Sequence, residues 1–175
     1  NTDLTRTIRI SAKAKGTLNQ LDQLSINGSI ANDLILQATG SARYLTQPDR
    51  LSYKLKLQKL STSYDKLLRL TNNVEIPSGL DSLGQIQLKG VLNGGINQIT
   101  GKQIQLNTNT YTQFRGDFQA NHLSDQKPIA FNLDIQEVRT TAANLEGFLP
   151  NGLPPEIQRL GQMRYTGTID GDVYD

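Results

Sequence analysis

Few side chains in this 175-residue sequence could do chemistry, and they are scattered along it. His122 is the single histidine, and cysteine is absent. A His-rich metal site needs more than one imidazole, and the pattern places no Ser-His-Asp arrangement around His122. His122 stands in a polar run before Pro128, which predicts an exposed turn residue. The sequence therefore predicts a protein that is not an enzyme and holds no metal or other cofactor.

Asp170, Gly171 and Asp172 are similar to the start of a calcium loop, because Ca²⁺ prefers clustered carboxylate oxygens. No later acidic residue in the sequence closes a twelve-residue loop of that kind. Asp-Gly after an alternating run is also the standard signal of a β-hairpin. The pattern favours a turn at 170–172 over a metal site.

A group of basic side chains could neutralise phosphate groups. Its members are Arg50, Lys54, Lys56, Lys59, Lys66 and Arg69. Nucleic-acid binding also calls for aromatic rings that stack on bases, and alternation puts Tyr53 on the face opposite Lys54 and Lys56. The group is therefore interpreted as a solvated outer face whose lysines protect a sheet edge, and no nucleic-acid partner is expected.

Composition narrows the class of protein. Hydrophobic residues make up 36% of the chain and charged residues 19%, which is typical of soluble proteins. No apolar run approaches the roughly 20 residues that a membrane-spanning helix needs. The net charge is +2, but residues 1–69 carry 11 of the 18 basic side chains and 5 of the 16 acidic ones. The absence of cysteine is compatible with an oxidising or a reducing compartment.

Alternation of apolar and polar residues runs through most of the chain and predicts β-strands with one apolar face. The clearest run is 51–58, where every second residue is apolar, and residues 131–136 follow the same pattern. Residues 6–15 alternate as well, and glycines such as Gly28 and Gly40 are interpreted as the turns that follow short strands. The fold class predicted is all-β.

The pattern also repeats. Leu83-Gly84 recurs as Leu160-Gly161 and Lys89-Gly90 as Thr166-Gly167, each 77 positions later. A fixed period is the signature of stacked units that bury apolar faces against one another. We expect one repetitive segment over 1–175, with units at 1–75 and 76–152 and the start of a third at 153–175, excised from a longer protein.

Two irregular segments, 61–73 and 140–151, interrupt the alternation and predict short helical turns. Prolines stand near the end of these segments or soon after them, at Pro77, Pro150, Pro154 and Pro155. Proline lacks the N–H that pairing inside a sheet requires, so connections outside the strands are expected at these positions.

The order of these motifs resembles the TamB-like members of the AsmA-like superfamily, especially the forms found in Bacteroidota. A Pro-led segment ends in Leu83-Gly84, a strand leads to a turn at 89–93, and alternating strands follow. The resemblance covers essentially the whole chain. It implies a repeated, curled β-sheet, a β-taco or open β-groove, with an apolar concave face and short irregular or helical connections.

The resemblance also implies a function in outer-membrane biogenesis. Such a protein is a periplasmic bridge whose groove shields or conducts the acyl chains of phospholipids between the inner and outer membranes. The parent chain would be anchored in the inner membrane outside this fragment and would span toward the outer membrane.

The residues predicted to line the groove supply surface and no chemical step. They are Ile8, Ile10, Leu34, Leu36, Leu55, Leu57, Ile86, Leu88, Ile104, Leu106, Phe131, Leu133, Ile135, Met163 and Tyr165.

Two alternatives account for the same apolar faces. In the first, the protein is a translocation and assembly module that helps outer-membrane β-proteins insert, by strand addition or chaperoning, with a BamA-like barrel as partner. In the second, another sheet covers the apolar face and the chain is a closed β-sandwich with a structural role. The repeat favours the groove over the sandwich.

Overall fold

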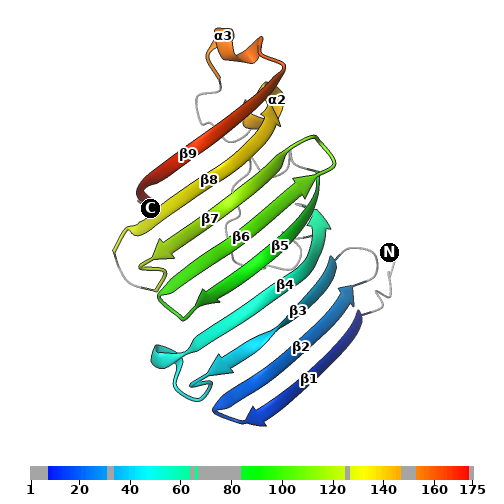
Figure 1. Ribbon diagram of the computed structural model, residues 1–175, viewed down its shortest axis with the longest axis vertical. Helices are drawn as coiled ribbons and strands as arrows, with labels where there is room; N and C mark the ends of the chain where they lie inside the picture. Colours follow the sequence, from blue (N-terminus) through cyan, green and yellow to red (C-terminus); the bar gives the residue numbers. More distant parts are fainter. Residues whose placement is uncertain are drawn as a thin grey trace, which may run out of the picture.

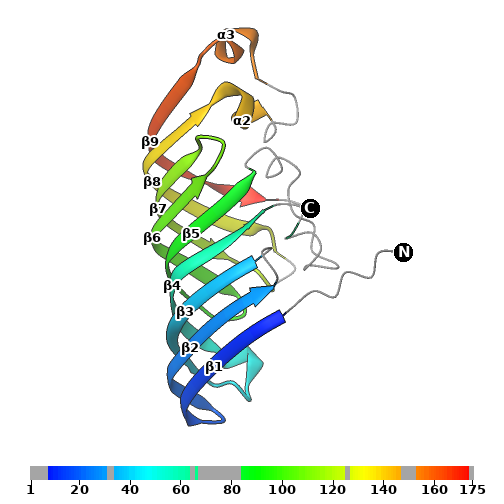
Figure 2. The same ribbon diagram turned by 90° about the vertical axis from the view of Figure 1, so that its right-hand side faces the viewer.

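The computed structural model describes residues 8–30, 34–63, 66, 84–124, 127–146 and 153–173. In this part of the chain nine strands form one antiparallel sheet, in which each strand pairs with its sequence neighbours (Figure 1). The sheet is open, with β1 and β9 as its edges. Figure 2 shows these edges at opposite ends of the row of strands, with two short helices beside the β8–β9 end.

The strands β4 and β8 are longer than the alternating runs at 51–58 and 131–136 that predict them. The strands are β1 (Ile8–Thr17), β2 (Gln20–Ile30), β3 (Leu34–Arg43), β4 (Ser52–Ser63), β5 (Gln85–Gly94), β6 (Gln98–Thr108), β7 (Gln113–Asn121), β8 (Ile129–Thr141) and β9 (Gln162–Val173). The helices are the 3₁₀-helix η1 (Pro48–Arg50), α2 (Ala142–Glu146) and α3 (Pro155–Gln158).

The prediction of an all-β chain is confirmed for the described residues. These strands form a single sheet and not the two packed sheets of the β-sandwich alternative. The strand order does not test the repeated, curled groove, which stays a prediction. No helix among the described residues is long and apolar enough to cross a membrane.

Strands recur at regular distances along the chain. β1, β5 and β9 begin at residues 8, 85 and 162, at intervals of 77 residues. The same interval separates the Leu-Gly pairs at 83–84 and 160–161 in the sequence. The division into units at 75 and 152 stays a prediction.

Every pair of neighbouring strands contains one irregularity of pairing. In each case an even-numbered strand, β2, β4, β6 or β8, contributes the extra residue. In β4, for example, Leu57 pairs with Gly90 and Leu60 with Leu88, so two residues of β4 face one of β5. A β-bulge of this kind bends its strand and increases the local twist. The bulges of β4 and β6 lie opposite neighbouring residues of β5, and those of β6 and β8 lie opposite neighbouring residues of β7.

Each odd-numbered strand carries a glycine close to these bulges, namely Gly16, Gly40, Gly90, Gly116 and Gly167. Gly16, Gly90 and Gly167 have φ angles of 143°, 151° and 149°, a conformation that other residues rarely adopt. A side chain at Gly40 or Gly116 would overlap a backbone carbonyl oxygen of the next strand. The glycines therefore let neighbouring backbones approach where the strands are irregular.

Several of the turns that the sequence predicts at glycines are wrong. Gly28 and Gly40 lie inside β2 and β3, and Gly90 lies inside β5. Asp170–Asp172, expected as a hairpin turn, is part of β9, where Gly171 pairs with Phe131 of β8. Glycine inside a strand often marks a bulge or a close approach of backbones, and this meaning replaces the turn.

The predictions for the connections have mixed outcomes. The helical turn predicted within 140–151 is present as α2. In the other irregular segment, residues up to Ser63 belong to β4, and most of the remainder lies outside the described residues. Pro154 and Pro155 lie at the start of α3 and outside strand pairing, as predicted. Pro77 and Pro150 lie outside the described residues.

Candidate functional site

The residues predicted to line a groove all lie on one face of the sheet, called the apolar face here. Residues that pair directly across antiparallel strands point to the same side. One row of paired residues runs from edge to edge through Ile10, Gly28, Leu36, Leu60, Leu88, Leu106, Phe114, Val138 and Tyr165. A second runs through Ala14, Leu24, Gly40, Leu55, Leu92, Gly101, Phe118, Leu133 and Ile169.

The other predicted residues join these rows through the alternation of their own strands. Leu57, Ile104 and Ile135 lie between the two rows. Ile8, Leu34, Ile86 and Met163 lie beyond the first row, and Phe131 lies beyond the second. The structure therefore brings the whole predicted set onto a single surface.

Burial on the apolar face is deep in inner strands from β4 to β8 and low in the two edge strands. Leu57, Ile86, Ile104 and Ile135 are buried, with 4–7% of each residue exposed. In the edge strands, Ile10 of β1 is 71% exposed and Tyr165 of β9 is 47% exposed. The apolar face thus continues to both edges of the sheet, where its side chains meet solvent.

Simple alternation does not identify every residue of the apolar face. Leu60 and Val138 lie on it, although each is out of phase with the alternating run before it. The reason is the bulge, which places Leu57 and Leu60 three positions apart on one face, and likewise Ile135 and Val138. A spacing of three inside an alternating run is the signal that could have found them. Leu24, Ile26, Leu92, Ile99, Phe114, Phe118 and Ile169 also lie on this face.

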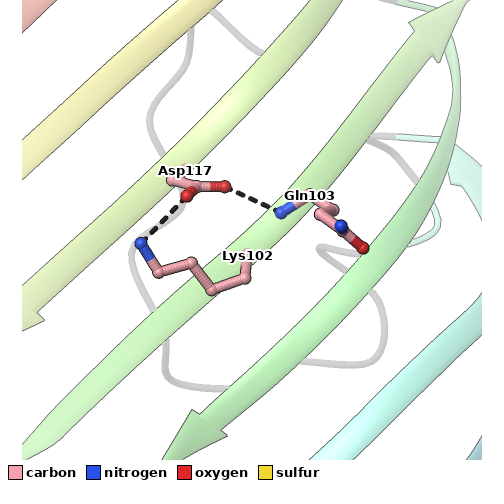
Figure 3. Close-up of polar contacts among 3 residues, drawn as sticks. All are labelled: Lys102, Gln103 and Asp117. Atoms are coloured by element: carbon pink, nitrogen blue, oxygen red, sulfur yellow. Dashed lines mark hydrogen bonds and ion pairs between the residues drawn. The ribbon is translucent and has the colours of Figure 1, made fainter.

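On the opposite face, called the polar face, Asp117 of β7 holds the bulge of β6 in place (Figure 3). Its Oδ1 accepts the backbone N–H of Gln103 at 2.7 Å, and its Oδ2 lies 2.9 Å from Lys102 Nζ. Gln103 has a φ of 52°, which places it in the left-handed region. The hydrogen bond from Lys102, above all, and that from Gln103 lower the pKa of Asp117, against the opposing effect of burial.

Glu137 has a comparable position beside the bulge of β8. Its Oε1 accepts the Nε–H of Arg139 at 2.9 Å and lies 2.9 Å from Nη2 of Arg164 in β9. The hydrogen bond from Arg139, followed by the positive charges of the neighbouring arginines, lowers the pKa of Glu137. Charged contacts on the polar face therefore lie at two of the bulges.

The helix α2 is attached to the sheet by a buried asparagine. Asn144 Nδ2 donates to the carbonyl oxygen of Thr110 at 2.5 Å and to Thr112 Oγ1 at 2.9 Å. The hydroxyls of Thr112 and Thr140 lie 2.9 Å apart, and Asn144 and Thr140 are both buried. This network joins α2 to the turn between β6 and β7.

The predicted basic group does not stay together. Lys54, Lys56 and Lys59 project from the polar face of β4. Arg50 lies in η1, where its guanidinium group covers the Tyr44 ring at 4.3 Å. Lys66 lies outside the nine strands, and Arg69 lies outside the described residues.

The described part of the chain contains no group of three or more His, Cys, Asp or Glu residues that could hold a metal ion. His122 has a φ of 65° and lies between β7 and β8, with its Nδ1 3.2 Å from the carbonyl oxygen of Pro128. It is only partly exposed, whereas its sequence context predicted an exposed turn residue.

Comparisons with protein-family models, with curated proteins and with solved structures find no match to this chain. The resemblance to the TamB-like proteins therefore depends on the sequence motifs alone.

Proposed function

We propose that this chain is a segment of a non-enzymatic protein whose apolar β-groove shields or conducts the acyl chains of phospholipids. The observation that carries the proposal is the apolar face itself. It continues without a break across nine strands and remains exposed at both edges of the sheet.

An apolar sheet face must be covered, and acyl chains are suitable covers for this one. The two rows that cross the sheet consist mainly of Leu, Ile, Val, Ala and Gly, with few aromatic rings. Apart from the Tyr165 hydroxyl at the edge, the side chains of these rows carry no polar group that would orient a ligand, which suits flexible hydrocarbon. Burial of each methylene is worth about 0.8 kcal/mol, so a lipid tail lying across several strands would be held without specific contacts.

The bulges support the curled form of the sheet that a groove requires. Each even-numbered strand has an extra residue, and each odd-numbered strand has a glycine close to it. Bulges and glycine kinks at matched positions are the means by which sheets curve. In this proposal the curl brings the apolar face around the acyl chains, and the polar face stays in water.

The cellular setting follows from the sequence resemblance. The segment would belong to a periplasmic bridge that is anchored in the inner membrane by a part of the protein outside this sequence. Phospholipid would move along the groove between the inner and outer membranes. Strands spaced at 77 residues are in keeping with a bridge lengthened by repetition.

The test compares two faces of the same strands. Leu55→Arg and Leu133→Arg place a charge in the second row of the apolar face, and Lys56→Glu changes a charge on the polar face. In a groove, the arginine head can reach water when the groove is empty, so we expect folded variants. Native mass spectrometry of the protein purified from membranes should show bound phospholipid in the wild type and in Lys56→Glu, and little in either arginine variant.

Wild-type protein that carries no phospholipid would contradict the proposal. So would arginine variants that are folded by circular dichroism and carry as much phospholipid as the wild type. If the arginine variants unfold, milder Leu55→Ser and Leu133→Ser variants give the same comparison.

The exposure of β1 and its unpaired outer edge favour a second function. All ten residues of this strand are exposed, and its outer edge pairs with no other described strand. A free edge of this length can accept a strand from another chain, which would suit a module that assists outer-membrane β-proteins through a BamA-like partner. Crosslinks from β1 to an unfolded outer-membrane β-protein, in a protein that carries no phospholipid, would favour this function over the groove.

A further inference from the structure

We propose that the polar face of β1–β4 is a docking surface for an anionic phospholipid bilayer. The basic residues on this surface, called the cationic face, are Arg9, Lys13, Lys15, Arg43, Lys54, Lys56 and Lys59. The surface lies on the side of the sheet opposite the apolar face, so the inference does not depend on the proposed groove.

Strand pairing places these residues on one side of the sheet. Lys13 pairs with Ser25, Ser25 with Thr39, and Thr39 with Lys56, which forms a row across four strands. Lysines thus stand at both ends of a row whose middle consists of hydroxyl side chains. The ends are three strand spacings apart, about 14 Å.

The charge of the cationic face is not balanced by carboxylates. Asp22 is the acidic residue within the strands β1–β4, and it lies at the bulge of β2 with its Oδ1 accepting from Gln20 Nε2 at 2.6 Å. No member of the cationic face forms an ion pair among the described residues. By contrast, in β5–β9 Lys102 is paired with Asp117, and Glu137 is shared by two arginines.

The surface between the basic side chains is hollowed, and both polar and apolar groups line the hollows. One open hollow of about 450 Å³ is lined by Lys13, Lys15, Gln23, Ser25 and Thr39, with Ala14, Leu24 and Gly40. A second, of about 640 Å³, is lined by Arg9, Ser11, Asn27, Ser29 and Gln37, with Ile8, Ile10, Gly28, Ile35 and Leu36. Hydroxyl and amide groups can donate to phosphate oxygens that the cations attract. The two hollows could therefore accept lipid headgroups.

The arrangement suits a bilayer better than a nucleic acid. Tyr53, the aromatic residue within β1–β4, lies on the apolar face, where it pairs with Ala42 and Gly94. The polar face of these strands therefore offers no ring on which a base could stack. The cations are spread over a sheet face and not along an element that could enter a groove of a duplex. Clusters of about four to eight basic residues are the usual size of a surface that binds anionic lipid.

The test measures binding of the intact protein to vesicles. We expect binding to vesicles of phosphatidylcholine with phosphatidylglycerol, weak binding to phosphatidylcholine alone, and release as salt is raised. Each basic residue near an anionic membrane contributes about fivefold to binding, so Lys13→Gln with Lys56→Gln should weaken it about 25-fold. Lys127→Gln with Arg159→Gln, which removes the same charge from the β7–β8 connection and from the end of α3, should leave binding nearly unchanged.

Several results would overturn the proposal. They are equal binding to both kinds of vesicle, equal weakening by the two double variants, and binding to duplex DNA without binding to vesicles. Ile26→Ser, on the apolar face of β2, should leave the salt-dependent binding in place, and its loss in this variant would assign the binding to the apolar face instead. Circular dichroism of each variant establishes that the sheet is intact, and Lys15→Gln with Lys54→Gln replaces the first pair if that pair unfolds.

Discussion

The carboxylate of Asp117 in β7 accepts a 2.7 Å hydrogen bond from the backbone N–H of Gln103 in β6. Because Gln103 has a φ of 52° at the bulge, this bond compensates for a backbone conformation that favours glycine. We expect Asp117→Ala to lower the free energy of unfolding by about 1 kcal/mol. Asp134→Ala, on the same face and in the next strand, should change it by less than about 0.5 kcal/mol. Urea denaturation measures both, and equal effects would contradict this role for Asp117.

The same carboxylate should make stability depend on pH. Its pKa in the folded protein is lowered below the ordinary value of 3.8, chiefly by the hydrogen bond from Lys102. A lowered pKa means that the stabilisation is complete above the unfolded pKa and is lost as the pH falls through the folded pKa. The difference in unfolding free energy between wild type and Asp117→Asn should therefore be constant near neutral pH and shrink below about pH 4. A difference that grew on acidification would be inconsistent with this sign.

Asn144 should be more important for stability than its place in a helix of five residues suggests. Asn144→Ala removes the buried hydrogen bonds that Nδ2 donates to the Thr110 carbonyl and the Thr112 hydroxyl, which costs about 1–3 kcal/mol. Asn132→Ala, at an exposed position of β8, is the matched control and should be close to neutral. Thermal melting of the two variants tests this, and similar melting temperatures would show that the network contributes little.

Two glycines on the apolar face should respond differently to the same change. Gly90 has a φ of 151°, and a Cβ there would overlap the Ile104 side chain, so Gly90→Ala should cost about 1–3 kcal/mol. No atom lies within 4 Å of a Cβ built at Gly28, so Gly28→Ala should be neutral or slightly stabilising. Chemical denaturation of both variants distinguishes them. If the two changes cost the same, close approach of strands is not the reason for glycine at 90.

Much of the strand pattern could be predicted because alternation reports directly which side of a strand is apolar. Leu55 and Leu57 were assigned to one face from spacing alone, and the register places them there. Leu60 cannot be assigned in this way, because the extra residue in β4 reverses the alternation of all the residues that follow it in the strand. Bulges depend on the pairing of two strands, and a single strand's sequence shows them only as a spacing of three.

Most of the wrong structural predictions concern glycines. Gly40 and Gly171 look like turn residues, since glycine adopts turn conformations easily, yet both lie inside strands. At Gly40 the reason is the carbonyl oxygen of Lys54 in the neighbouring strand, a contact between segments that local sequence cannot reveal. Long-range contacts of this kind also make the network around Asn144, which lies 34 residues from Thr110.

The most direct test of the central claim, that the apolar face holds acyl chains, compares adjacent residues of β6. Leu106 lies in the first row of the apolar face, and Gln105 points to the polar face. A photo-crosslinking amino acid is placed at either position in cells that make the protein, and adducts are identified by mass spectrometry. We predict a phospholipid adduct from position 106 and none from position 105. Absence of an adduct at 106, or equal adducts at both positions, would contradict the account.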